Sequence, residues 1–167
     1  HRNIENNIKT GENWIDFGRG KINFLHERDP KLINYKKYNI DLVMECSGKF
    51  NNKKHAENHL KSGAKKVLFS APVKDADITS VFGVNHKDIL LRHKIISNAS
   101  CTTNALAPII KVLDQKLGII NGNMTTIHSI TNDQNILDNS HKDLRRARAA
   151  FSSIVPTSTG AAKSIGL

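Results

Sequence analysis

The chain has 167 residues, enough to bury one hydrophobic core or parts of two. Its formal net charge of +10 suits anionic ligands, but its basic residues do not alternate with aromatic ones as in a dedicated nucleic-acid surface. The two cysteines suggest neither a disulfide framework nor a metal site, no stretch is apolar enough to span a membrane, and the first residues show no signal-peptide pattern. We therefore expect a cytoplasmic protein with no metal and no dedicated nucleic-acid or membrane partner.

The first 25 residues contain short apolar stretches interrupted by turn residues. The glycine-rich tip 18–20 has apolar residues on both sides, namely Trp14, Ile15 and Phe17 before it and Ile22, Phe24 and Leu25 after it. This pattern predicts a β-hairpin that serves as scaffold. The charged segment 27–30 follows, and Pro30 predicts a turn there.

A strand, a helix and a second strand are predicted between residues 41 and 69. The apolar run 41–46 is followed by the tight turn Ser47-Gly48, a helical pattern over 51–63 and the apolar run 66–69. This order predicts a βαβ unit with two parallel strands. Ser47, Gly48 and Ser70 then lie at the carboxyl ends of the strands, where ligands of parallel sheets gather. From the residues alone, an ordinary glycine turn and a strand end are the simpler explanation.

Three other residues of this unit carry reactive or metal-binding groups. Cys46 lies within the expected buried strand, which favours packing over reactivity. His55 and His59 have the spacing of two ligands on one helix face, but no third ligand is evident in the sequence. We therefore expect a solvated helix face there and no metal site.

Cys101 stands between two hydroxyl residues, Ser100 and Thr102, directly before a helical pattern that Gly118 ends. At the first turn of a helix, unpaired backbone N–H groups and the helix dipole favour a thiolate, which makes Cys101 a candidate nucleophile. The alternative is a small buried residue at a strand–helix junction, as most free cysteines are. We expect a change of domain just before this cysteine, giving domains 1–100 and 101–167.

The last third of the chain contains three candidate segments. Residues 124–130 predict a β-strand that carries His128. Residues 143–150 contain three arginines whose guanidinium groups suit phosphate, although a surface or subunit contact fits at least one of them. Residues 156–163 place hydroxyl groups and a glycine before a helix start, which suits either anion binding or simple helix capping.

The segment 97–108, SNASCTTNALAP, resembles the active-site segment of phosphorylating glyceraldehyde-3-phosphate dehydrogenases. Other segments typical of that family follow in the same order, namely ERDP (27–30), FSAP (69–72), TTIH (125–128), DLRRARAA (143–150) and PTSTGAAK (156–163). The resemblance covers essentially the whole chain, and SCTTN is its most specific motif. Many members have a second cysteine at the position of Ala105, but that cysteine takes no part in the chemistry.

The resemblance implies an α/β fold, in which part of a Rossmann-type NAD(P)-binding domain precedes the start of an α+β catalytic domain. It also implies a middle part of a longer enzyme, because the family's G-x-G-x-x-G turn has no match here and its second domain continues past the position of Leu167. The family is tetrameric, so we expect a homotetramer. The residue that selects NAD or NADP precedes the position of His1, which leaves the choice of cofactor open.

The resemblance also assigns roles to individual residues. Cys101 matches the nucleophile and His128 its base. The matching cofactor contacts are Arg28, Ser47, Gly48, Ser70 and Asn132. The matching substrate or phosphate contacts are Ser100, Thr102, Thr131, Arg146, Thr159 and Gly160.

The reaction that these roles imply converts D-glyceraldehyde 3-phosphate, inorganic phosphate and NAD(P) to 1,3-bisphosphoglycerate and NAD(P)H through a cysteine thioester. The sequence does not fix the direction of flux, glycolysis or gluconeogenesis. One alternative is an erythrose-4-phosphate dehydrogenase, in which water attacks the thioester. Others are a Cys-His acyl hydrolase and a basic non-catalytic binding protein. The missing glycine turn adds the possibility that this chain alone is inactive.

Overall fold

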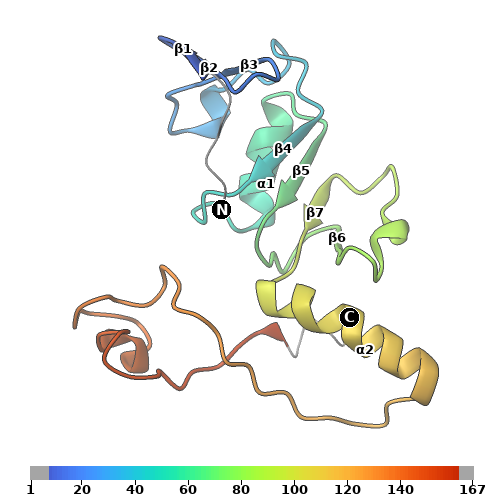
Figure 1. Cartoon of the computed structure of the whole chain (residues 1–167). Helices are drawn as coiled ribbons and strands as arrows, with labels where there is room; N and C mark the ends of the chain where they lie inside the picture. The colour runs from blue at the N-terminus through green and yellow to red at the C-terminus, as the bar shows by residue number, and fades with distance from the viewer. Residues whose placement is uncertain (1–7, 162–167) are drawn as a thin grey trace.

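A computed structural model describes residues 8–161 of the chain (Figure 1). The strands are β1 (Lys9–Gly11), β2 (Trp14–Asp16), β3 (Lys21–Asn23), β4 (Leu42–Glu45), β5 (Lys66–Phe69), β6 (Ile78–Thr79) and β7 (Ile95–Ser97). The α-helices are α1 (Lys53–Lys61) and α2 (Cys101–Leu117), and short 3₁₀ helices span Pro30–Leu32, His86–Asp88 and Leu144–Ala147. Two sheets therefore occupy the N-terminal part of the chain, and α2 follows them.

The first sheet is a small antiparallel meander of β1, β2 and β3. The tip between β2 and β3 closes because the Asp16 carboxylate accepts hydrogen bonds from the backbone N–H groups of Gly18, Arg19 and Gly20. Gly18 and Gly20 have φ angles of 86° and 110°, a backbone region that glycine enters without steric cost. The predicted hairpin is confirmed. Residues 1–7, which the same prediction included, lie outside the described part.

The second sheet is parallel, with strand order β4-β5-β7-β6. Helix α1 connects β4 to β5, so the predicted βαβ unit is confirmed. Asn52 caps α1 by accepting a hydrogen bond from the His55 N–H at 3.0 Å. The helix ends before Gly63, whose φ angle of 105° breaks the helical path.

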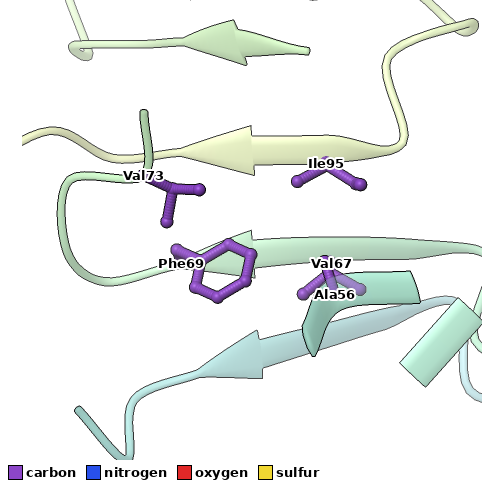
Figure 2. Close-up of a cluster of buried hydrophobic side chains, with 5 residues drawn as sticks. All are labelled: Ala56, Val67, Phe69, Val73 and Ile95. Carbon is purple, nitrogen blue, oxygen red and sulfur yellow. The ribbon is translucent and has the colours of Figure 1, made fainter. Parts of the chain in front are cut away.

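The core lies where α1 covers the parallel sheet (Figure 2). It consists of five buried side chains, namely Ala56 of α1, Val67 and Phe69 of β5, Val73, and Ile95 of β7. Alternate residues of β5 point to this side, as strand geometry requires. A second cluster of Val81, Ala99 and Ala107 joins the N-terminal half of α2 to the loop after β6.

Gly63 packs so closely that replacing it with alanine should destabilise the fold. A Cβ at this position would lie 2.8 Å from the backbone nitrogen of Lys36, and the φ angle would remain unfavourable. We expect Gly63→Ala to lower the free energy of unfolding by about 2 kcal/mol or more, measured by urea denaturation. Gly118→Ala is the matched control, because its φ is also positive (73°) but an added Cβ meets open space, so that about 1 kcal/mol is expected. Equal losses for the two variants would contradict this account of Gly63.

Three expectations from the sequence are wrong. Cys46 follows β4 and is exposed, because β4 is an edge strand of which only Glu45 is buried. His59 is not solvated but only 4% exposed, since it lies on the side of α1 that faces the sheet. Residues 124–130 form no strand, because within residues 8–161 they have no backbone partner to pair with.

Beyond α2, residues 119–161 follow a long irregular path away from the two sheets (Figure 1). Helix α2 connects the parallel sheet to this irregular segment. Its outer side is exposed in the described structure, with Ile109, Val112, Leu113 and Leu117 all between 44% and 80% accessible. The helix therefore rests on the domain that precedes it along one side only. The second helix start, expected after residue 160, lies almost wholly outside the described residues.

Candidate active site

Cys101 is the first residue of α2, as the sequence predicts. Ser100 caps the helix, because its hydroxyl accepts a hydrogen bond from the Thr103 N–H at 3.0 Å. The Asn104 side chain donates to the carbonyls of Asn98 and Ser100, which fixes the path of the chain into the helix. The Cys101 thiol is consequently held in the first turn, exposed and close to the positive end of the helix dipole.

The thiol of Cys101 lies beside the imidazole of His128. Sγ is 3.2 Å from Nε2, although 27 positions separate the two residues in the sequence. The other ring nitrogen, Nδ1, lies 2.7 Å from the carbonyl oxygen of Ser129. A carbonyl only accepts, so Nδ1 carries a proton and Nε2 of the neutral ring is free to accept the thiol proton. The arrangement is that of a nucleophile and its base.

The electrostatics of this pair favour its charged form. The hydrogen bond from His128 lowers the pKa of the Cys101 thiol. Burial opposes this shift, while contacts with the side chain and backbone of Thr102 add to it. The bond to the Ser129 carbonyl raises the pKa of His128, and the neighbouring sulfur raises it further. Both shifts stabilise a thiolate beside an imidazolium. Within the described structure, Cys101 is thus set apart from Cys46, for which no such partner exists.

A second set of predicted residues meets at the carboxyl ends of β4 and β5. The Ser47 backbone N–H donates to the side chain of Glu45 at 2.8 Å, and the Ser47 hydroxyl donates to the same oxygen. The Ser70 N–H donates to the backbone carbonyl of Glu45 at 3.1 Å. Gly48 has a φ of 71°, and an added Cβ there would meet nothing within 4 Å. The structure thus brings Ser47, Gly48 and Ser70 to one open edge of the sheet.

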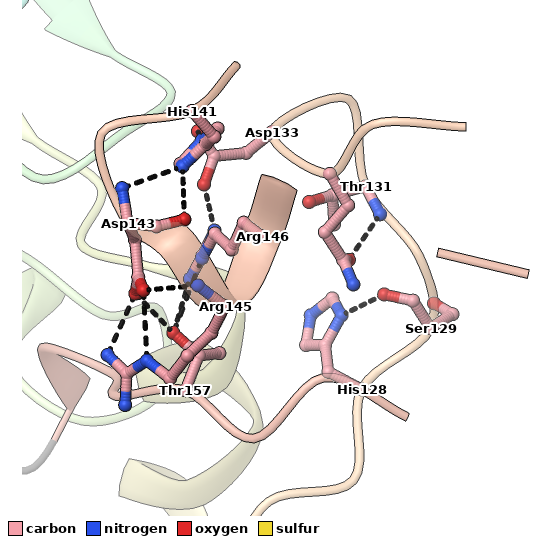
Figure 3. Close-up of polar contacts among 10 residues, drawn as sticks. His128, Ser129, Thr131, Asp133, His141, Asp143, Arg145, Arg146 and Thr157 are labelled. Carbon is pink, nitrogen blue, oxygen red and sulfur yellow. Dashed lines mark hydrogen bonds and ion pairs between the residues drawn. The ribbon is translucent and has the colours of Figure 1, made fainter. Parts of the chain in front are cut away.

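Arg146 belongs to a polar cluster in the irregular segment (Figure 3). Its guanidinium is paired with the Asp133 carboxylate and donates to the Thr157 hydroxyl at 3.2 and 3.3 Å. Neighbouring Arg145 binds Asp143 through two nitrogen atoms, at 2.8 and 2.9 Å, and lowers the pKa of that carboxyl to about 2. In the described part of the chain, the side-chain hydrogen bonds of Arg146 thus lead to Asp133 and Thr157 and not to the residues around Cys101.

The other predicted contacts are exposed residues. Arg28 lies between β3 and the 3₁₀ helix Pro30–Leu32, and Asn132 lies in the turn after residue 131. The Thr131 N–H donates to the side chain of Gln134, and the Thr159 hydroxyl accepts from the Ala161 N–H at 3.2 Å. Gly160 is exposed beside Thr159. Their binding roles stay predictions.

Sequence reasoning missed several residues that the site uses. The Ser129 carbonyl orients His128, but a backbone acceptor leaves no trace in side-chain patterns. Asp133 neutralises Arg146 across 13 positions, which no local pattern indicates. Outside the site, the burial of His59 had a usable signal, because it occupies the same helix face as Ala56 and Leu60.

Two further properties concern what residues 8–161 lack. None of their helices is long and apolar enough to cross a membrane. The same residues hold no group of three or more His, Cys, Asp or Glu side chains placed to bind a metal ion.

Comparison with known proteins matches both parts of the chain. Residues 1–53 match the family model for the glyceraldehyde 3-phosphate dehydrogenase NAD binding domain, and residues 100–167 match the model for the C-terminal domain of the same enzyme. The parallel sheet is accordingly part of a Rossmann-type domain, and the match to the C-terminal domain includes α2.

Three relatives show how far the similarity extends. The chain is 54% identical to glyceraldehyde-3-phosphate dehydrogenase of Zymomonas mobilis over 168 residues, 51% identical to glyceraldehyde-3-phosphate dehydrogenase 2 of Bacillus subtilis over 168, and 48% identical to the Thermotoga maritima enzyme over 167. Each comparison covers 100% of this chain and 49% or 50% of the relative. The chain therefore spans about half the length of the curated relatives it matches, and it belongs to the glyceraldehyde-3-phosphate dehydrogenase family.

Proposed function

We propose that this chain carries the nucleophile and base of a phosphorylating, NAD(P)-dependent aldehyde dehydrogenase that acts on D-glyceraldehyde 3-phosphate. The observation that carries the proposal is the 3.2 Å contact between the Cys101 sulfur and His128 Nε2 at the start of α2. Family membership supports the substrate and the requirement for inorganic phosphate. We place the two domains at residues 1–100 and 101–167, in a cytoplasmic homotetramer.

The sheet edge at β4 and β5 fits one part of a dinucleotide. Gly48 leaves the backbone open to close approach, and the Ser70 side chain is exposed beside it. Arg28 and Asn132 are the further candidate contacts. When bound, the nicotinamide supplies the acceptor for a hydride. The residues of this chain do not discriminate between NAD and NADP.

The first chemical step uses the thiolate. His128 Nε2 accepts the Cys101 proton, and the thiolate attacks the aldehyde carbon to form a thiohemiacetal. The imidazolium and the backbone N–H groups at the start of α2 stabilise the oxyanion that develops on the former carbonyl. The imidazolium then donates its proton to this oxygen, which gives the thiohemiacetal hydroxyl and a neutral His128 ring. The neutral imidazole then removes the hydroxyl proton as hydride leaves the carbon, and a thioester to Cys101 results.

The second step releases the acyl group. Inorganic phosphate attacks the thioester carbon, an acyl phosphate departs, and the thiolate of Cys101 is regenerated. We assign the attacking phosphate to Ser100, Thr102, Thr159, Gly160 and Arg146, and the phosphate of the substrate to Thr131. The Arg146 guanidinium is paired with the Asp133 carboxylate, so inorganic phosphate must displace this carboxylate before Arg146 can bind it.

A dehydrogenase assay on the native protein from its source tests the proposal. Beyond one equivalent per active site, NADH or NADPH should form from glyceraldehyde 3-phosphate only when inorganic phosphate is present, because the thioester must be released before the next turnover. Formation without phosphate and with preference for erythrose 4-phosphate would identify the sister enzyme. Hydrolysis of thioesters with no reduced nicotinamide would identify an acyl hydrolase, and either result would overturn the proposal.

A further inference from the structure

A buried chain of hydrogen bonds ends at the Ser47-Gly48 turn. The Tyr35 hydroxyl lies 2.9 Å from Nδ1 of His59, and Nε2 of His59 lies 3.1 Å from Oε2 of Glu45. The other oxygen of Glu45 accepts both hydrogen bonds of Ser47, from the N–H and from the hydroxyl. Four side chains from three separate segments thus form one continuous path.

The middle of this path is shielded from water. His59 is 4% exposed and Glu45 is 7% exposed. Tyr35 and Phe50 place their rings against the imidazole, with centroids 5.7 and 6.5 Å away. A carboxylate in such surroundings is costly unless hydrogen-bond donors compensate its charge, and here three donors do so.

For a neutral His59 ring, the donors and acceptors allow one proton arrangement. Glu45 receives three hydrogen bonds and acts only as an acceptor, so Nε2 of His59 must carry a proton. Nδ1 of the neutral ring then accepts the Tyr35 hydroxyl proton. Burial, and then the charge of Glu45, raise the pKa of Tyr35, which keeps its hydroxyl a donor. Every proton along the path is thereby used once.

The turn depends on the path for its shape. The Ser47 hydroxyl accepts from the Lys49 N–H at 3.2 Å while it donates to Glu45. Gly48, between them, adopts a positive φ with no side chain to pack. Phe50 closes the turn against the rings of His55 and His59 at 5.2 and 6.5 Å. Holding Glu45 in place therefore holds residues 47–50 in place.

We propose that Tyr35, His59 and Glu45 are positioning residues that preorganise the Ser47-Gly48 turn for the dinucleotide. The inference rests on the proposed function for the nature of the ligand, but the hold on the turn stands on the contacts alone. A histidine that only filled the core would need neither the Nε2–H tautomer nor the hydrogen-bonded link through Glu45 to Ser47. A turn fixed in advance loses less conformational entropy on binding, so breaking the hydrogen-bonded path should weaken the affinity for NAD.

The test begins without a variant or a ligand. Long-range ¹H–¹⁵N NMR correlations of the 167-residue chain should show His59 as the Nε2–H tautomer. The amide of Ser47 should exchange slowly with solvent. Tyr35→Phe, which removes one hydroxyl and little volume, should alter the His59 correlations. An Nδ1–H tautomer in the unmodified chain would overturn the inference.

A matched pair at His59 tests the hold on the turn. His59→Leu removes both nitrogens, and we expect exchange of the Ser47 amide to become at least about tenfold faster. His59→Gln offers an N–H near the position of Nε2 and should restore most of the protection. Equal exchange in both variants and the unmodified chain would overturn the inference, whatever happens to NAD.

The affinity for NAD, measured by fluorescence titration, completes the test. His59→Leu should weaken it by about tenfold and His59→Gln by less, while the rate of Cys101 alkylation stays the same in both. Unchanged affinity in His59→Leu would overturn the role in binding. If the unmodified native protein binds no NAD but Ser47 responds as expected, the cofactor assignment of the proposed function fails and the hold on the turn is supported.

Discussion

Replacing Cys101 with serine is expected to abolish dehydrogenase activity, with a loss of about 10³-fold or more in kcat/KM. A serine hydroxyl is far less acidic than a thiol, so His128 cannot hold it in the ionised form that attacks an aldehyde. The loss should appear as a lower kcat, because the nucleophile forms its bond in the reaction and not in substrate binding. Steady-state formation of reduced nicotinamide by the native-length variant measures this effect.

Selective alkylation gives the control for this prediction. Both cysteines are exposed, so accessibility alone would let iodoacetamide label them at similar rates. Only Cys101 has an imidazole 3.2 Å from its sulfur and a place in the first turn of a helix. At neutral pH, peptide mapping should find Cys101 alkylated well before Cys46. Equal labelling of the two would contradict the assignment of Cys101 as an activated thiol.

Replacing His128 with asparagine is expected to raise the pKa of the Cys101 thiol and slow its alkylation at neutral pH by about tenfold or more. In the unmodified protein, the hydrogen bond from His128 lowers the thiol pKa, so the thiolate persists as the pH falls below the range of an ordinary cysteine. Removing the imidazole removes the main cause of that shift. The alkylation rate should then rise only at higher pH.

The measurement is the alkylation rate as a function of pH in both proteins. The midpoint for His128→Asn should lie about one unit or more above that of the unmodified protein. A variant of the half-buried His86, whose ring accepts a hydrogen bond from the Gly83 N–H, is the control, and His86→Asn should leave the midpoint where it was. Coincident profiles for His128→Asn and the unmodified protein would show that the 3.2 Å contact does not activate the thiol.

The parts of the fold that the sequence predicts well are those set by local patterns. The apolar runs around 41–46 and 66–69 and the helical pattern between them suffice to predict β4, α1 and β5, because this order is typical of a βαβ unit. The start of α2 at Cys101 follows from the capping hydroxyl of Ser100. In both cases the physical cause lies within a few residues of its effect.

The failures have long-range causes. Residues 124–130 have the composition of a strand, but a strand needs a paired neighbour, and none faces them in the described structure. His59 looks polar enough for solvent, yet Glu45 and Tyr35 satisfy both of its nitrogens inside the fold. Composition does not reveal which distant group will supply a partner.

The candidate site likewise contains residues placed by the local sequence and residues placed by long-range contacts. Ser100 and Thr102 flank Cys101 in the sequence, so their position beside the thiol needs no tertiary information. The approach of His128 across 27 positions was expected only from the family resemblance, and the contact agrees with it. The sequence does not predict the pairing of Arg146 with Asp133. It indicates that the arginines of 143–150 suit phosphate, but no local pattern shows that a carboxylate of the same chain pairs with one of them.

The most direct test of the account is to trap the acyl-enzyme. The native protein would be incubated with glyceraldehyde 3-phosphate and NAD in the absence of inorganic phosphate, quenched in acid and analysed by peptide mass spectrometry. We predict one 3-phosphoglyceroyl group on the peptide that contains Cys101, and its loss as an acyl phosphate when inorganic phosphate is added. Reduced nicotinamide formed while the Cys101 peptide stays unmodified, or an acyl group on Cys46, would contradict the account.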